Sequence, residues 1–349
     1  MARFASRTGR RRAGAVSQYQ RLRMSLSIDA RLETWPLKRP FIISRGSTSE
    51  AHVISVAVRD GEIIGRGEAV PSARYGQTIE SALAALEPMK QHPDLDRQEI
   101  QKRLPPGAAR NALDCALWDL EAKRSGKRVW ELSNISPLDE VQTSFTIGLD
   151  APAPTGAVAR ENSHLPILKL KLGGDDKDVA RVEAVRANAP SARLMIDANE
   201  SWSPQHYRKV VPELSRLGVE LIEQPFPAKD DSALAELDRP IPVCADESCH
   251  TSADLARIAG RYDAINIKLD KTGGLTEALV LVECGRQAGL TLLFGCMVST
   301  SLGIAPARIL AHPNDLVDLD GPLLLAKDRP HGLRYENGRV GLPSRELWG

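Results

Sequence analysis

Short apolar runs recur at regular intervals between about residues 140 and 320 of this chain. All but the last are followed by a helical pattern of apolar positions. Successive runs begin roughly 25 residues apart, which is room for one strand, one helix and two loops. Eight such units predict a closed parallel barrel rather than an open sheet. The predicted strands are residues 143–149, 167–172, 194–199, 221–226, 243–248, 265–270, 291–297 and 316–320.

The preceding part of the chain has a different pattern. Residues 27–35, 52–60 and 62–70 are strand-like, with a turn signal at Asp60-Gly61. Residues 78–91 and 108–124 then show helical spacing. Strands followed by helices predict an α+β unit.

Together these patterns predict an α/β protein: a modified TIM barrel of the (β/α)7β type with an N-terminal α+β capping domain. The expected units are a disordered tail over 1–23, a capping domain over 24–135, a barrel with the active site over 140–320, and a C-terminal segment over 321–349 that returns to the capping domain.

Charge and composition narrow the possible partners. The chain has 46 basic and 45 acidic residues, but seven arginines and no acids fall within residues 1–28. The remainder is mildly acidic, which gives no support to nucleic-acid binding. No apolar run approaches the roughly 18 residues of a membrane helix. The five cysteines lack CxxC spacing, which predicts reduced thiols in a cytoplasmic protein, and Cys244 and Cys249 do not repeat a zinc-ligand pattern.

Carboxylates end three consecutive predicted strands. Asp197, Glu223 and Asp246 stand at the ends of strands three, four and five, where a buried charge is costly unless it is paired, metal-bound or functional. Functional groups of a parallel barrel collect at this face. Three carboxylates there predict a site for one hard divalent cation per subunit, above all Mg²⁺. The alternative is that each carboxylate caps the following helix.

Lysines end two further strands. Lys169 and Lys171 are two residues apart on strand two and project to the same side. Strand six ends in Lys268, and strands two and six of eight are diametrically opposite, so Lys171 and Lys268 are expected to face each other. Mg²⁺ and the like charge of Lys169 are expected to lower a lysine pKa from its usual value of about 10.4. The alternative is that these lysines pair structurally with the three carboxylates.

Two opposed bases beside a metal suggest removal of a proton α to a carboxylate and return of a proton to the opposite face, a pattern known for the enolase superfamily. The motifs KLKL, IDAN, EQP, ADES and NIKLDKTGG resemble the muconate-lactonising subgroup of that superfamily over nearly all of residues 24–349. No histidine ends a predicted strand, unlike the pattern of mandelate-racemase-type members.

The runs NALDCALWDLEAK, DANESW, CADESCHT and DLDGP resemble bacterial dipeptide epimerases, above all those acting on L-Ala-D/L-Glu. This resemblance implies that Asp197, Glu223 and Asp246 bind Mg²⁺ and that Lys171 and Lys268 are the two acid/base catalysts. Lys169 would hold the substrate carboxylate or tune its neighbour. Asn199 and Asp270 are expected in the layer that supports these groups.

Other residues are candidates for substrate recognition. Asp318 and Asp320 alternate to one face at the end of strand eight and could bind an α-ammonium group; the alternative for Asp320 is a turn before Gly321. Within the capping-domain loops 43–49 and 71–78, Arg45 or Arg74 could pair with a glutamate side chain. The cluster of Ser299, Thr300 and Ser301 is ambiguous between substrate contact and helix capping.

These expectations lead to an Mg²⁺-dependent isomerase that epimerises dipeptides at the C-terminal residue, with L-Ala-D/L-Glu in murein peptide turnover as the expected substrate. The alternatives are an N-acylamino-acid racemase, an o-succinylbenzoate synthase or, from another class, a non-catalytic small-molecule binding protein. The expected partner is a small dipeptide, with no nucleic acid and no membrane, in a chain that could form a homo-oligomer.

Overall fold

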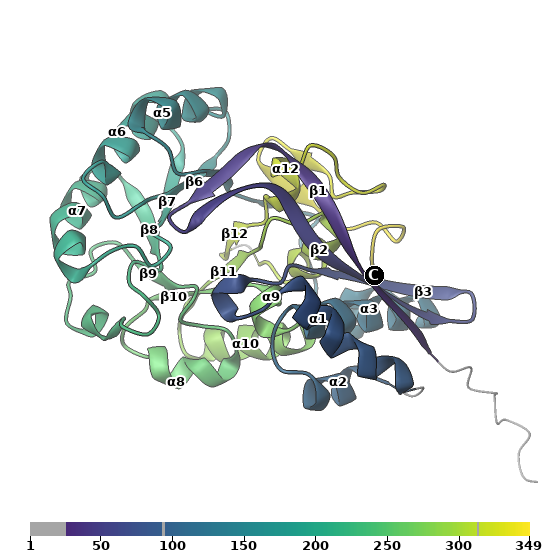
Figure 1. Ribbon diagram of the computed structural model, residues 1–349. Helices are drawn as coiled ribbons and strands as arrows, with labels where there is room; N and C mark the ends of the chain where they lie inside the picture. The colour runs from purple at the N-terminus through teal and green to yellow at the C-terminus, as the bar shows by residue number, and fades with distance from the viewer. Residues whose placement is uncertain (1–25, 93–94, 313) are drawn as a thin grey trace, which may run out of the picture.

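The computed structural model describes residues 26–92, 95–312 and 314–349. The predicted disordered tail over residues 1–23 lies outside these ranges. Within them, an antiparallel sheet in the order β1-β2-β3 comes first, followed by an eight-stranded parallel sheet in the order β12-β11-β10-β9-β8-β7-β6-β5. The predicted α/β fold with a capping unit and a barrel of eight parallel strands is confirmed (Figure 1).

The capping sheet is covered by one long helix. Gly65 and Gly67 allow this packing, because a Cβ at either position would lie 2.1 Å from a backbone oxygen of α3. Apolar residues of the sheet and helix, among them Val56 and Leu113, form a core of their own. The elements are β1 Ser27–Ile43, β2 Gly46–Asp60, β3 Ile63–Ala69, α1 Ile79–Leu86, α2 Arg97–Arg103, α3 Ala108–Ser125 and α4 Val129–Leu132, with 3-10 turns η1 Ala73–Tyr75 and η2 Glu87–Gln91.

The β1–β2 hairpin is longer than its sequence pattern predicted. The expected loop over residues 43–49 is a tight turn, since Ile43 pairs with Gly46 across the two strands. Only Ser44 and Arg45 lie between the strands. The hairpin arches over the barrel and its tip approaches the ends of β6 and β7 (Figure 1). This places Arg45 above the carboxyl ends of the barrel strands.

The barrel strands carry the alternation that the sequence predicted, but most are shorter. The chain turns soon after each strand, and Ser144, the residue before the first strand, donates its backbone N–H to Val317 O of the last strand (2.9 Å). The strands are β5 Phe145–Ile147, β6 Ile167–Lys171, β7 Arg193–Asp197, β8 Val219–Glu223, β9 Val243–Ala245, β10 Ala264–Ile267, β11 Thr291–Gly295 and β12 Leu316–Asp318.

Helices surround the barrel, with one departure from the predicted alternation. After β8 the chain forms only the 3-10 turn η3 Ser232–Ala235, where a full helix was expected. The other elements are α5 Pro152–Glu161, α6 Asp178–Asn188, α7 Pro204–Arg216, η4 Ser252–Asp254, α8 Leu255–Ile258, α9 Leu269–Thr272, α10 Leu275–Gln287, α11 Ser301–Arg308 and α12 Gly321–Leu324. None of the helices in the described ranges is long and apolar enough to cross a membrane.

The C-terminal segment contacts both units. Leu325 bridges to Leu37 of β1, and the indole of Trp348 donates to the carbonyl of Cys115 in α3 (3.0 Å). Strands β13 Tyr335–Glu336 and β14 Arg339–Gly341 pair with β4 Glu140–Gln142 beside the barrel. The segment therefore fastens the capping unit to the barrel.

Candidate active site

One layer of small and apolar side chains fills the barrel beneath the charged residues. Ile167, Met195, Leu221, Cys244, Ala264 and Leu293 form this layer. Side chains two positions apart on a strand point to the same face. Lys169, Asp197, Glu223, Asp246 and Asn266 each lie two residues after a member of the layer, so the strand period itself places them together above it.

The structure brings the predicted carboxylates and lysines into one buried cluster, which we call the mouth cluster: Lys169, Lys171, Asp197, Glu223, Asp246, Lys268 and Asp318. Lys169 Nζ lies 2.6 Å from both Glu223 Oε2 and Asp318 Oδ2. Lys171 Nζ lies 2.5 Å from Asp197 Oδ2, and Lys268 Nζ lies 2.7 Å from Asp246 Oδ2. Each of the four carboxylates therefore faces an ammonium group.

The carboxylates determine the charge state of these lysines. Burial alone would lower the pKa of Lys268, but Asp246 and Glu223 outweigh burial and raise that pKa well above its usual value. The pKa of Lys169 is raised in the same way against burial, by Asp318 and Glu223. The lowering of a lysine pKa that is expected beside Mg²⁺ stays a prediction. The carboxylates stabilise the ammonium form of the lysines only while their negative charge is not engaged by a metal ion. Coordination of a cation would therefore weaken this stabilisation.

The donor set of the mouth cluster fits a hard cation. As the side chains lie, no three Asp, Glu, His or Cys residues of the described ranges already form a metal-binding group, because lysine ammonium groups stand among the carboxylates. Asp197, Glu223 and Asp246 are nonetheless almost fully buried on adjacent strands. Asn199 and Asn266 each donate to one of them and leave a buried amide oxygen without a partner. Oxygen donors of this kind suit Mg²⁺.

The two aspartates after β12 differ in their surroundings. Asp318 is engaged by Lys169 and by the hydroxyl of Ser144 (2.5 Å). Asp320 follows the end of the strand, rather than lying on it as predicted, and accepts from the backbone N–H of Thr146 (2.6 Å). Burial and the neighbouring Asp318 raise the pKa of Asp320 to about 7. Asp320 therefore has fewer interaction partners than Asp318 and is the more available of the two carboxylates.

Both predicted arginines of the capping unit reach the barrel. Arg45 donates to the carbonyl of Asn199 (2.8 Å) and to Glu247 Oε1 (2.9 Å). Arg74 makes two 2.5 Å hydrogen bonds to the carboxylate of Glu200. Both arginines are thus paired with carboxylates on the barrel loops.

Three other predicted residues lie at the junction of the two units. The hydroxyl of Thr300 donates to Glu68 (2.5 Å) on β3, so it takes part in attaching the capping sheet. Asp270 accepts from the backbone of Val70 (2.8 Å) and has the same role, and burial raises its pKa to about 6. Ser299 is buried beside Thr300.

Several residues of this region were not predicted from the sequence. Lys271 is fully buried, lies 2.7 Å from Asp246 Oδ1, and donates to the carbonyls of Asp246 and Asn266. Glu247 is also buried, and burial together with Asp246 and Asp197 raises its pKa to about 8. Lys271 was visible as a second lysine three positions after Lys268, but no strand-end pattern marked it.

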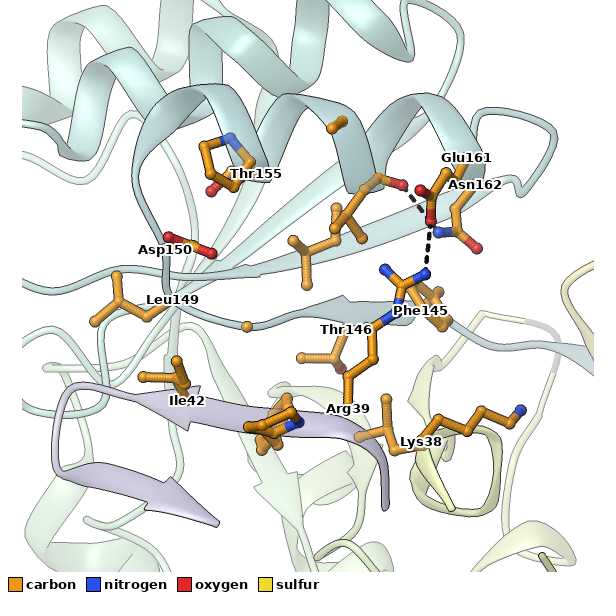
Figure 2. A pocket seen from close by; sticks show the side chains of 18 of the residues that line it. Lys38, Arg39, Ile42, Phe145, Thr146, Leu149, Asp150, Thr155, Glu161 and Asn162 are labelled. Atoms are coloured by element: carbon orange, nitrogen blue, oxygen red, sulfur yellow. Dashed lines mark hydrogen bonds and ion pairs between the residues drawn. The ribbon is translucent and has the colours of Figure 1, made fainter. Parts of the chain in front are cut away.

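A cavity of about 690 Å³ lies beside this site rather than in it. It is bounded by β1, β5, α5 and the start of the C-terminal segment, and Figure 2 shows Arg39 reaching from β1 to Glu161 of α5 (3.3 Å). Among its lining residues, Thr146 contacts the side chains of Asp318 and Asp320. Its size does not make it the reaction centre, because the opposed lysines and carboxylates lie elsewhere.

Two family models match the chain. Residues 156–346 match the enolase C-terminal domain-like family, and residues 26–133 match the mandelate racemase / muconate lactonizing enzyme N-terminal domain. Among individual proteins, the chain is 44% identical over 317 residues to an L-Ala-D/L-Glu epimerase of Escherichia coli, covering 89% of this chain and 98% of that protein. It is 42% identical over 302 residues to an N-acetyl-D-glutamate racemase of Pseudoalteromonas, covering 85% and 95%.

Solved structures agree with the sequence relatives. An enolase family member from Agrobacterium tumefaciens with homology to dipeptide epimerases, holding sodium and L-Ala-L-Glu, is 48% identical with a TM-score of 0.91, over 93% of this chain and all of that one. A dipeptide epimerase from Methylococcus capsulatus with Mg and L-Arg-D-Lys is 34% identical with a TM-score of 0.85, over 92% and 98%. This chain therefore belongs to the mandelate racemase / muconate lactonizing enzyme family of the enolase superfamily, and within it resembles the dipeptide epimerases.

Proposed function

We propose that this protein is an Mg²⁺-dependent isomerase that epimerises dipeptides at the α-carbon of the C-terminal residue, with L-Ala-D-Glu and L-Ala-L-Glu as its substrates in murein peptide metabolism. The observation that carries the proposal is the placement of Lys171 and Lys268. They stand at the ends of β6 and β10, which are separated by three strands of the barrel sheet. A substrate α-carbon between them would have one amine on each face.

The reaction removes one proton from the α-carbon and returns one proton to it. The lysine that lacks its proton removes the α-proton, and the electrons of the broken C–H bond pass into the substrate carboxylate to give an enediolate. The opposite lysine, in its ammonium form, then donates a proton to the other face of the α-carbon. The configuration inverts, and the two lysines exchange protonation states.

The remaining residues of the mouth cluster stabilise the charge that develops. Asp197, Glu223 and Asp246 would hold Mg²⁺, which supplies Lewis-acid stabilisation of the doubly charged carboxylate. Lys169, fixed between Glu223 and Asp318, adds a positive charge on the same side. Lys171 shares Asp197 as a partner, so metal binding and acid/base chemistry are electrostatically linked.

Recognition of the dipeptide falls to the residues around the mouth cluster. Asp320, with Asp318 beside it, is the candidate for the α-ammonium group of the first residue. Arg45 is the candidate for the glutamate side chain of the second. Ser299 lies buried on the β11–α11 connection.

One alternative has a specific observation in its favour. The Pseudoalteromonas relative is named an N-acetyl-D-glutamate racemase, and such a substrate has no free amine for Asp320 to bind. The same lysines would racemise it. Both candidate substrates contain glutamate, so the two functions differ at the amine and not at the side chain.

Incubation with L-Ala-L-Glu and Mg²⁺ in D₂O tests the proposal. We expect deuterium at the glutamyl α-carbon and formation of L-Ala-D-Glu, followed by mass spectrometry and chiral chromatography. N-acetyl-L-glutamate and N-succinyl amino acids serve as comparison substrates. Turnover of these compounds without any exchange of dipeptides would overturn the proposed substrate.

A further inference from the structure

Gln224 follows Glu223 directly in the chain and has no part in the proposed reaction. Its side chain is fully buried. Its backbone has a φ of 31°, in the left-handed region that residues other than glycine occupy at a cost in free energy. Such residues persist where their surroundings hold them in place, and they are common at functional sites. The contacts of Gln224 show what holds it.

The backbone of Gln224 joins the two neighbouring strand ends. Its carbonyl accepts from the backbone N–H of Glu200 (2.8 Å), three residues after Asp197 at the end of β7. Its own N–H donates to the carbonyl of Cys244 (2.9 Å) on β9. The ends of β7, β8 and β9 carry the three carboxylates predicted to bind the metal, so one residue is bonded to all three segments.

The side chain of Gln224 extends this contact beyond the end of β9. That strand ends at Ala245, so the backbone N–H groups of Asp246 and Ser248 lie beyond the strand pairing. Gln224 Oε1 accepts from both of them, at 2.9 Å and 3.0 Å. A side-chain oxygen therefore takes the place of a strand carbonyl for this segment, and it fixes the backbone from which the Asp246 carboxylate projects.

The nitrogen of the same amide is anchored in a buried network. Gln224 Nε2 donates to the carbonyl of Phe226 (2.8 Å). It also lies 2.9 Å from the hydroxyl oxygens of Ser248 and Tyr262, which both donate to Asp231 Oδ2, at 2.6 Å and 2.9 Å. These acceptors determine which way the amide faces, because a reversed amide would place its NH₂ group against two backbone N–H groups.

We propose that Gln224 is a positioning residue for the metal site and sets the separation between Glu223 and Asp246 before a cation binds. The inference rests on the proposed Mg²⁺ site. Glu223 is joined to Gln224 through the chain and Asp246 through the contact with Oε1, so the two cannot move apart without breaking a buried hydrogen bond. Groups that support metal ligands in this way typically contribute about 10- to 100-fold to the affinity for the ion.

The variant Gln224→Met tests the inference, because methionine has a similar volume but neither accepts from Asp246 nor donates to the network. The probe is Mn²⁺, whose free concentration is followed by electron paramagnetic resonance without substrate. We expect the dissociation constant for Mn²⁺ to rise roughly 10- to 100-fold. Deuterium exchange by the variant should recover more of its rate at saturating Mg²⁺ than at limiting Mg²⁺.

Gln224→Gly is a second test variant. Glycine removes the same amide but relieves the positive φ, so this variant should show the same loss of Mn²⁺ affinity with a smaller backbone cost.

Tyr262→Phe is the matched control. It removes a buried hydroxyl of the same network together with its hydrogen bond to Asp231. The two hydrogens of Gln224 Nε2 keep two acceptors, on Phe226 and Ser248. Stability in urea should fall, as expected for the loss of a buried hydrogen bond, while the affinity for Mn²⁺ should stay unchanged.

Unchanged Mn²⁺ affinity in either Gln224 variant would overturn the inference, as would an equal loss of affinity in Tyr262→Phe. Failure of both Gln224 variants to fold would also overturn it, because Gln224 would then serve the fold and not the site. If the unaltered protein does not bind Mn²⁺, the proposed metal site itself fails, so the two failures are distinguishable from the first measurement.

Discussion

Two networks of buried charged residues in this protein differ in how completely their polar atoms are hydrogen-bonded. The seam network consists of Glu33, Glu68, Thr300 and Arg329 and joins the capping sheet to the barrel. Both oxygens of Glu68 accept from Thr300 or Arg329, and Arg329 also pairs with Glu33. At the mouth cluster, by contrast, buried oxygens of the adjacent Asn199, Asn266 and Glu247 have no partner.

This difference distinguishes a network that attaches two structural units from a site that is suited to chemistry. Buried polar atoms are almost always hydrogen-bonded in folded proteins, so a group of unsatisfied acceptors in one place requires an explanation. The seam is a closed network whose charges stabilise the docking of the two units. Around the mouth cluster, buried acceptor oxygens lack hydrogen-bond partners. This is expected of a site that binds a cation and a polar substrate.

Removal of one catalytic lysine should give the largest effect. We expect Lys171→Ala and Lys268→Ala each to reduce α-proton exchange roughly a thousandfold, each from one epimer of the substrate preferentially. The measurement is the rate of deuterium uptake by L-Ala-L-Glu and by L-Ala-D-Glu separately. Circular dichroism checks that the fold is retained. Equal and mild losses with both epimers would contradict the two-base scheme.

Removal of a charged residue from the seam network should change stability rather than catalysis. Arg329→Met leaves Glu68 buried without its cation, and we expect a loss of about 3–5 kcal/mol in the free energy of unfolding, measured in urea. Exchange by the folded fraction at low temperature should persist. Arg334→Met is the matched control, because the pairs that Arg334 forms with Glu336 and Glu140 are exposed. A stable variant that has lost exchange would mean that the seam serves the chemistry.

Asp320 should produce a pH effect of intermediate size. Its pKa of about 7 means that it is largely protonated at pH 6 and ionised at pH 8. An ammonium group binds the ionised form, so KM for L-Ala-L-Glu should fall roughly fivefold from pH 6 to pH 8. Ionisation of Asp320 alone would give roughly tenfold, but the substrate amine, with a pKa of about 8, loses part of its own protons over the same range. Asp320→Asn should remove this dependence. An N-acetyl substrate with the same dependence would argue against amine recognition by Asp320.

The smallest expected effect lies where β1 crosses the barrel. A Cβ on Gly148 would lie 3.2 Å from the carbonyl oxygen of Ile42, which accepts a hydrogen bond from Leu149 N. We expect Gly148→Ala to cost roughly 1 kcal/mol of stability and to raise KM slightly by displacing the hairpin. Gly341→Ala, whose nearest contacts lie at 3.8 Å, is the control. Unchanged stability and KM in Gly148→Ala would show that the backbone at this crossing shifts without measurable cost.

The sequence predicted the mouth cluster well because its placement follows from local rules. A strand period of two puts Lys169, Asp197 and Glu223 on the interior face, and parallel strands bring their ends to one side. The apolar runs marked these strands clearly. The alternative that the lysines pair with the carboxylates also describes the geometry, since each lysine contacts at least one of them.

Other features depend on long-range contacts that a single sequence does not reveal. Glu68 and Arg329 are 261 residues apart, and nothing near either residue indicates the other. The partners of Arg45 on Asn199 and Glu247 follow from the length of the β1–β2 hairpin, which exceeded the predicted strands. The rise in the pKa of Lys169 and of Lys268 caused by their carboxylate partners was not predicted, because it depends on distances to those carboxylates.

The central claim is that two different groups move the proton on opposite faces of the α-carbon. Its most direct test is the isotope content of both epimers at low conversion of L-Ala-L-Glu in D₂O. The two-base account predicts that nearly every L-Ala-D-Glu molecule carries deuterium at the glutamyl α-carbon, because the second lysine supplies a proton that has exchanged with the solvent. Product that keeps the substrate's own proton would contradict it.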